Sequence, residues 1–200
     1  STLKGEEEAV LRAFHRVRVA GNRALLIIAP RHPQRFGDVV RLCRHEGLST
    51  VRRTELPIDG EPRADAVVLD SIGELPQVYQ IATAVFVGGS LVPWGGHNIL
   101  EPALFGRPIV FGPYMENFAE IAETFRQNSA AIQVRTDREL EDAMVSLMAD
   151  PVLRARLGAA ARALIEANRG ARGRTMDVIL ELFPSDEGTR GEVLPFRVMH

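Results

Sequence analysis

Short apolar runs alternate with amphipathic stretches along almost the whole chain, and this alternation constrains the fold more than any other feature. Strands without a polar face are typical of a parallel sheet that helices cover on both sides. Five nearly continuous apolar runs predict such strands, and a sixth run predicts a weaker one: 24–29, 66–69, 83–87, 108–111, 130–134 and, as the weaker one, 49–53.

The stretches between these runs have the period of amphipathic helices. Val10, Phe14 and Val17 recur at spacings of four and three, which places them on one stripe. Alternating strands and helices predict the α/β class, with a Rossmann-like doubly wound parallel sheet over residues 1–183 and an irregular tail over 184–200. Further helices are expected at 36–45, 74–82, 98–105, 117–126 and 138–148, with two more after Pro151, the last having a stripe of Met176, Ile179, Leu180 and Phe183.

Composition excludes several classes of protein. The 24 basic side chains are balanced by 26 acidic ones, which argues against a partner held through nucleic-acid phosphates. Cys43 is the only cysteine, so no intrachain disulfide can form and a reducing compartment is favoured. No histidine, cysteine or carboxylate pair has the spacing of a metal site, and no cofactor motif is present.

Because the chain begins at Ser1 directly before a helical pattern, we expect a fragment or domain of a larger protein.

The stretch GGSLVPWGGHNILEPALFGRPIVFGP, residues 88–113, predicts a ligand site. It lies between a strand and a helix, where open α/β sheets bind ligands. Glycines bring backbone N–H groups close to a ligand, and the helix start adds a positive dipole end, which together favour a phosphate. A tight strand-to-helix connection without any ligand is the alternative. The residues expected to form the site are Gly89, Ser90, Gly95, Gly96, His97 and Asn98.

Glu101 has two interpretations that the sequence alone leaves open. It follows Asn98 by three residues, so the pair could form a capping box that only completes the helix start. Alternatively, its carboxylate accepts hydrogen bonds from the two neighbouring hydroxyls of a ribose beside the phosphate.

Two other strand ends carry candidate binding residues. Arg31 and His32, in PRHPQRF, follow the first strand, and a guanidinium can bind a phosphate through two parallel hydrogen bonds. The alternative is an exposed loop with ordinary surface charges. Gly73 and Leu75, in DSIGELPQVY, could face a flat base, or the segment could simply start a helix with Ser71 as its cap.

Three segments resemble the donor-binding region of bacterial 3-deoxy-D-manno-octulosonic acid (Kdo) transferases, in the same order along the chain. They are STLKGEEEAVL at 1–11, PRHPQRF at 30–36 and GGSLVPWGGHNILEPALFGRPIVFGPYMENF at 88–118. The combination of GGHN-x-x-EPA with PRHP-x-RF is specific, whereas EPA-x-x-x-G-x-P alone indicates only the wider group of B-type glycosyltransferases. The resemblance covers about residues 1–183 and implies the carboxyl-terminal half of such an enzyme.

This resemblance implies a role for each matching residue. Glu101 would bind the ribose of CMP-Kdo, and Arg31 would neutralise the phosphate as the glycosidic bond breaks. Asn117 would lie near the transferred sugar. The family usually has a histidine after the opening Ser-Thr, where this chain has Leu3, so we expect no donor contact of that kind. Donors around the phosphate would come from Gly89, Ser90, Gly95, Gly96 and Asn98.

The resemblance also implies an activity. The family transfers Kdo to a lipid A precursor at the cytoplasmic face of the bacterial inner membrane, in lipopolysaccharide synthesis. We expect an inverting glycosyltransferase that requires no metal ion, whose general base, acceptor site and membrane association belong to an amino-terminal half. This chain alone is then expected to be inactive. The alternatives are another B-type glycosyltransferase, a UDP-sugar epimerase, or a nucleotide-binding module without catalysis.

Overall fold

The computed structural model describes the backbone of residues 1–57 and 62–182, with side chains described up to residue 168. The chain divides into two compact units, Ser1–Ile165 and Glu166–His200. The described residues of the second unit belong to helix α7 (Pro151–Leu182). The expected boundary after residue 183 stays a prediction, and the expected tail at 184–200 lies outside the described residues.

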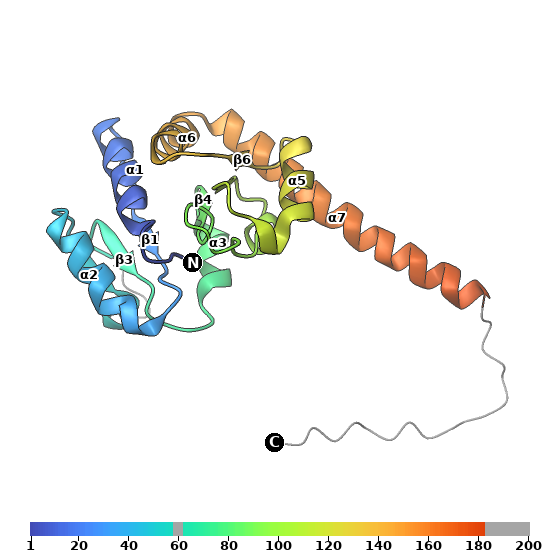
Figure 1. The fold of residues 1–200 in the computed structure, drawn as a ribbon, viewed down its shortest axis with the longest axis horizontal. Coiled ribbons are helices and arrows are strands. Elements are labelled where there is room, and N and C mark those ends of the chain that lie inside the picture. The colour runs from blue at the N-terminus through green and yellow to red at the C-terminus, as the bar shows by residue number, and fades with distance from the viewer. Residues whose placement is uncertain (58–61, 183–200) are drawn as a thin grey trace, which may run out of the picture. The chain divides into compact units, whose positions relative to one another are not determined.

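All six predicted strands are present, and the order of elements can be followed in Figure 1. The strands are β1 (Leu26–Ile28), β2 (Thr50–Arg52), β3 (Ala66–Val68), β4 (Val85–Val87), β5 (Ile109–Phe111) and β6 (Ile132–Gln133). The other helices are α1 (Glu7–Val19), α2 (Phe36–His45), α3 (Leu75–Ile81), α4 (Leu100–Leu104), α5 (Ala119–Gln127) and α6 (Asp137–Ala149). Three short 3₁₀ helices are η1 (Pro33–Arg35), η2 (Arg53–Glu55) and η3 (Glu116–Phe118).

The described strands form two three-stranded sheets in which every pair is parallel. Their orders are β1-β3-β2 and β4-β5-β6, with Ile27 opposite Val67 and Phe86 opposite Val110. Parallel strands and intervening helices confirm the predicted α/β class. The division into two sheets was not anticipated, and it leaves one edge of β1 and one edge of β4 unpaired among the described strands.

Helix α1 packs against both sheets. Leu11 and Phe14 belong to the apolar cluster around Ile28 of β1, whereas Ala9 and Ala13 pack in a second cluster with Val110 of β5. Helix α1 also lies along α6, where Arg12 pairs with Asp137 at 2.5 Å and Arg16 pairs with Asp142 at 2.6 Å. These ion pairs are largely exposed, so the buried apolar side chains supply most of the stabilisation.

One continuous helix, α7, replaces the two helices that the sequence predicted after Pro151. The Asp150 carboxylate accepts the N–H groups of Val152 and Leu153 at 2.9 Å, so the helix starts with a side-chain cap. Pro151 is tolerated in the first turn. Isolated glycines inside a helix cost about 1 kcal/mol each relative to alanine, which is too little to end it. The stripe predicted at Met176, Ile179, Leu180 and Phe183 lies outside the residues whose side chains are described.

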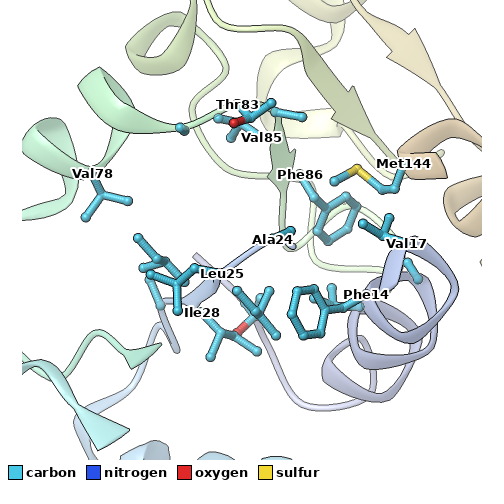
Figure 2. A pocket seen from close by; sticks show the side chains of 18 of the residues that line it. Phe14, Val17, Ala24, Leu25, Ile28, Val78, Thr83, Val85, Phe86 and Met144 are labelled. Carbon is cyan, nitrogen blue, oxygen red and sulfur yellow. The ribbon is translucent and has the colours of Figure 1, made fainter. Parts of the chain in front are cut away.

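A cavity of about 380 Å³ is lined by residues of β1 and β4, among others. Figure 2 shows its walls, where Phe14 and Val17 of α1, Phe86 of β4 and Met144 of α6 point toward one another. The lining is mostly apolar, with a few polar residues such as Thr2, Arg23 and Thr83. None of the described helices combines the length and apolarity that crossing a membrane requires.

Candidate nucleotide-binding site

Two loops that follow strand ends lie beside each other. We call residues 30–35, after β1, the arginine loop, and residues 88–97, after β4, the glycine loop. Thr2 bonds the arginine loop, because its carbonyl accepts the Arg31 N–H at 2.9 Å. The rings of His32 and Trp94 meet edge to face at 6.4 Å between centroids. The structure thus brings together two segments that are about sixty positions apart in the sequence.

Internal acceptors already occupy several N–H groups of the glycine loop. The Glu6 carboxylate, at the start of α1, accepts the Gly89 N–H at 2.6 Å and the Leu91 N–H at 3.2 Å. The Gly96 N–H donates to the Gly89 carbonyl at 2.8 Å, and the His97 N–H donates to the Gly88 carbonyl at 3.1 Å. A carboxylate of the chain itself therefore lies where the sequence predicted a phosphate.

Ser90 is fully buried and serves the loop rather than its surface. Its hydroxyl donates to the Val87 carbonyl and accepts the Gly112 N–H at 2.8 Å. These bonds join the glycine loop to the end of β5 and leave the Ser90 side chain away from solvent. These contacts support the loop, and a role of Ser90 at the phosphate stays a prediction.

The paired glycines at 95 and 96 make room for neighbouring protein groups. A Cβ on Gly95 would lie 2.4 Å from Nδ2 of Asn117, and one on Gly96 would lie 2.3 Å from Sδ of Met115. Asn117 is exposed and donates through Nδ2 to the Trp94 carbonyl at 3.2 Å. The segment after β5 is thereby fixed to the glycine loop, and a contact of Asn117 with the donor stays a prediction.

Three nitrogen-bearing side chains share one electrostatic environment. Arg31 and His32 are exposed, and both add positive potential at the half-buried His97. Burial first, then the Ser1 amino group, Arg31 and His32, lower the pKa of His97 to about 4. His97 is therefore neutral near pH 7. Its Nε2 atom is buried and has no hydrogen-bond partner among the described residues, so an added ligand atom would find an unsatisfied polar group there.

Asn98 and Glu101 form a hydrogen-bonded pair at the start of α4. The Asn98 Oδ1 atom accepts the Leu100 N–H at 2.9 Å, and its Nδ2 donates to Oε1 of Glu101 at 3.3 Å. This differs from a capping box, in which the glutamate accepts the backbone N–H of the cap residue. Glu101 is half-buried and acts electrostatically on Tyr79, whose pKa is raised chiefly by burial and secondly by this carboxylate. An oriented carboxylate of this kind is suited to bind paired hydroxyls.

The segment with Gly73 and Leu75 has other contacts. Gly73 lies in an exposed turn with a φ of +89°, and Leu75 begins α3 and packs partly buried against the core. The Ser71 hydroxyl donates to Glu74, which also pairs with Arg53 of η2 at 3.1 Å. Ser71 therefore orients Glu74 and makes no cap hydrogen bond to α3. A contact of Gly73 or Leu75 with a base stays a prediction.

The sequence analysis missed Glu6, Glu7 and Arg35. Glu6 and Glu7 are fully buried, and Glu7 accepts a hydrogen bond from Arg35 of the arginine loop at 2.6 Å. The consecutive glutamates resembled an ordinary acidic first turn of a helix. The helical period could have indicated that Glu6 is buried. Glu6 precedes Val10 by four residues and so lies on the same face of the helix as the apolar stripe.

Comparisons with known proteins show which family this chain is similar to. No protein-family model matches the chain. The chain is 36% identical over 180 residues to the 3-deoxy-D-manno-octulosonic acid transferase of Haemophilus influenzae and 34% identical over 182 residues to that of Bordetella pertussis. A crystal structure of the C-terminal CMP-Kdo binding domain of WaaA from Acinetobacter baumannii matches with a TM-score of 0.76 at 34% identity, covering 82% of this chain and 86% of that one. The chain belongs to the Kdo transferase family.

The match to the Kdo transferases is partial on their side. Both relatives are matched over 90% of this chain but only 42% of their own length. The family's usual histidine is replaced by Leu3, which is buried and whose N–H donates to Glu6 at 2.9 Å. That position therefore packs against the protein interior here, and the site has to be built from the two loops and α4.

Proposed function

We propose that this chain is the donor-binding half of a Kdo transferase and binds CMP-Kdo between the arginine loop and the start of α4. The observation that carries the proposal is the unpartnered, buried Nε2 atom of His97 beside Arg31 and His32, at the end of parallel strands. A negatively charged group that accepts hydrogen bonds, such as a phosphate, would satisfy all three side chains.

Side chains, rather than the N–H groups of Gly89 and Leu91, hold the phosphate in this proposal, because Glu6 occupies those N–H groups. No carboxylate pairs with Arg31 in the described part of the chain. Its guanidinium can therefore bind two phosphate oxygens in parallel. As the glycosidic bond breaks, negative charge grows on the phosphate, and a cation already in place stabilises that charge.

Glu101 binds the ribose in this proposal. Asn98 holds one of its carboxylate oxygens at 3.3 Å, which orients the other oxygen to accept hydroxyl hydrogen bonds. Asn117, exposed beside Trp94, is close enough to the glycine loop to contact the transferred sugar. The structural match to a CMP-Kdo binding domain supports this choice of nucleotide over a uridine one.

Calorimetry with CMP tests the site. We expect Arg31→Ala and Glu101→Ala each to weaken binding about tenfold or more, since a hydrogen bond to a charged group contributes about 1.5–3 kcal/mol. Arg41→Ala and Glu8→Ala are matched controls, because both side chains are exposed and neither has a hydrogen bond or ion pair to the two loops among the described residues. Equal affinity in all five proteins would reject the site. Stronger binding of UMP or UDP than of CMP would instead favour another glycosyltransferase or an epimerase.

The complete reaction, in the same proposal, moves Kdo from CMP-Kdo to a lipid A precursor at the cytoplasmic face of the inner membrane. The names of the relatives and the motif resemblance support it. Inversion at the anomeric carbon, independence of metal ions and a general base on another half are parts of the proposal. An assay of the full-length enzyme with and without a chelator, followed by NMR of the product's anomeric centre, tests these parts.

A further inference from the structure

Two neighbouring carboxylates at the start of α1 reach the two loops of the site. Glu6 and Glu7 are each 0% exposed, which is rare for carboxylates and requires specific partners. Their side chains diverge: Glu6 bonds the glycine loop, and Glu7 bonds Arg35 of the arginine loop. The first turn of α1 therefore contacts both segments that the proposed function uses.

Glu6 holds the glycine loop through backbone groups alone. Its Oε2 atom accepts the N–H groups of Leu3 at 2.9 Å and Gly89 at 2.6 Å, and its Oε1 atom accepts that of Leu91 at 3.2 Å. Bonds from a charged acceptor to successive N–H groups fix the backbone path more firmly than neutral ones. Because His97 follows in the same loop and its N–H bonds Gly88, the path of residues 88–91 determines where His97 lies.

Glu7 holds the arginine loop through a charge pair. Nη1 of Arg35 lies 2.6 Å from Oε1 of Glu7, and the side chains are 21% and 1% exposed. Oε2 of Glu7 is buried without a partner among the described residues, so this carboxylate depends on Arg35. The Arg35 N–H in turn bonds the His32 carbonyl at 2.9 Å, which sets the turn that carries Arg31.

We propose that Glu6 and Glu7 are positioning residues. They hold the arginine loop and the glycine loop in fixed positions relative to each other, so that Arg31 and His97 face one bound donor. This inference rests on the proposed function and adds to it the part of the chain that shapes the site. Neither carboxylate touches the donor. Each acts through its own loop, Glu7 by way of Arg35 and Glu6 by way of the N–H groups of Gly89 and Leu91.

Three substitutions that replace a glutamate with the uncharged glutamine test this proposal. Glu6→Gln and Glu7→Gln are the variants, and Glu8→Gln is the matched control. Glu8 lies on the same helix turn and makes the same change of charge, but its side chain is exposed. At a temperature where circular dichroism shows every variant folded, we expect Glu6→Gln and Glu7→Gln to weaken CMP binding about tenfold. Glu8→Gln should bind as the unchanged protein does. Equal affinity of all folded variants would overturn the proposal.

A double-mutant cycle separates positioning from general stabilisation. If Glu7 acts by placing Arg31, then Arg31→Ala costs less affinity in the Glu7→Gln protein than in the unchanged one. A purely structural Glu7 leaves the Arg31→Ala penalty the same in both, and that result would count against the proposal.

Amide hydrogen exchange gives a reading that does not depend on the nucleotide. We expect Glu6→Gln to speed exchange of the Gly89 and Leu91 amides, while amides of β5 keep their protection. Unchanged exchange at both amides would refute the Glu6 part even if CMP binds. If the unchanged protein fails to bind CMP, the proposed function fails, and the exchange result still decides whether Glu6 holds the loop.

Discussion

His97 combines a buried, unpartnered nitrogen with a pKa that burial and nearby positive charges lower to about 4. A phosphate bound beside it would add negative charge and raise that pKa toward its ordinary value of 6.5. Binding would then take up a proton between about pH 4 and pH 6.5. Because binding of the phosphate raises the proton affinity of His97, linkage requires that the phosphate binds more tightly as the pH falls through that window.

We therefore predict that the ratio of CMP affinities between the unchanged protein and His97→Gln increases as the pH is lowered from 7 to 5. The phosphate itself gains a proton near pH 6, and this loss of negative charge weakens binding to both proteins equally. Its effect therefore cancels in the ratio of the two affinities. Calorimetry at several pH values measures it. A ratio that stays constant would mean that His97 does not contact the phosphate.

At the scale of the element, the end of β5 and the glycine loop form one packed unit. The Gly112 N–H donates to Oγ of Ser90 at 2.8 Å, and the Tyr114 N–H donates to the Ser90 carbonyl at 3.0 Å. A Cβ on Gly112 would lie 2.1 Å from that carbonyl oxygen. Because both surfaces are backbone, neither can move away as a flexible side chain would.

Gly112→Ala should therefore destabilise the protein by roughly 1–3 kcal/mol through overpacking. Gly37→Ala is the contrasting control, since Gly37 lies in α2 and its Cβ would meet only side-chain atoms at 3.5 Å or more. Alanine is favoured over glycine in a helix by up to about 1 kcal/mol, so this change should be neutral or stabilising. Urea unfolding monitored by circular dichroism gives both values. A neutral or stabilising effect of Gly112→Ala would show that the contact relaxes at little cost.

The strands and helices were predictable because burial on both faces and the helical period are local properties of the chain. α2 spans Phe36–His45, as its apolar spacing predicts, and each of the six strands falls within its predicted apolar run. The two helices expected after Pro151 are one continuous helix, and the isolated glycines within it cost too little to end it. The helix start at Leu100 depends on Asn98, whose bonding partner cannot be read from spacing alone.

At the scale of the whole molecule, each sheet has one natural probe in a segment connected to it, Cys43 in α2 and Trp94 in the loop after β4. Cys43 is fully buried in the cluster with Phe14 and Ile28, and burial raises the pKa of its thiol to about 11. Trp94, the only tryptophan, is in the loop that follows β4. Helix α1 packs into clusters on both sheets, so the two should unfold together.

We predict that Cys43 labelling and Trp94 fluorescence report the same denaturant midpoint. The native thiol should react very slowly at pH 8, because the thiolate is the reactive form and the side chain is inaccessible. Labelling in full denaturant is the control for reagent activity. Two separate midpoints would show that the sheets unfold independently and that α1 does not couple them.

The sequence by itself determined the class of fold, the order of its elements and the segments where a ligand could bind. Each of these follows from local patterns, since strand ends, helix starts and glycine clusters lie close together in the chain. The family resemblance rests on the same three segments and agrees with the structural match.

Only the tertiary structure decided what the glycine loop contacts. The N–H groups of Gly89 and Leu91 could equally well have bound a phosphate, and they bind Glu6, more than eighty residues earlier in the chain. The bonding partner of these N–H groups depends on which side chain the tertiary fold places beside the loop, and no local sequence pattern predicts that. Local patterns likewise do not predict the pairing of Glu7 with Arg35, the contact between His32 and Trp94, or the cavity lined by β1 and β4.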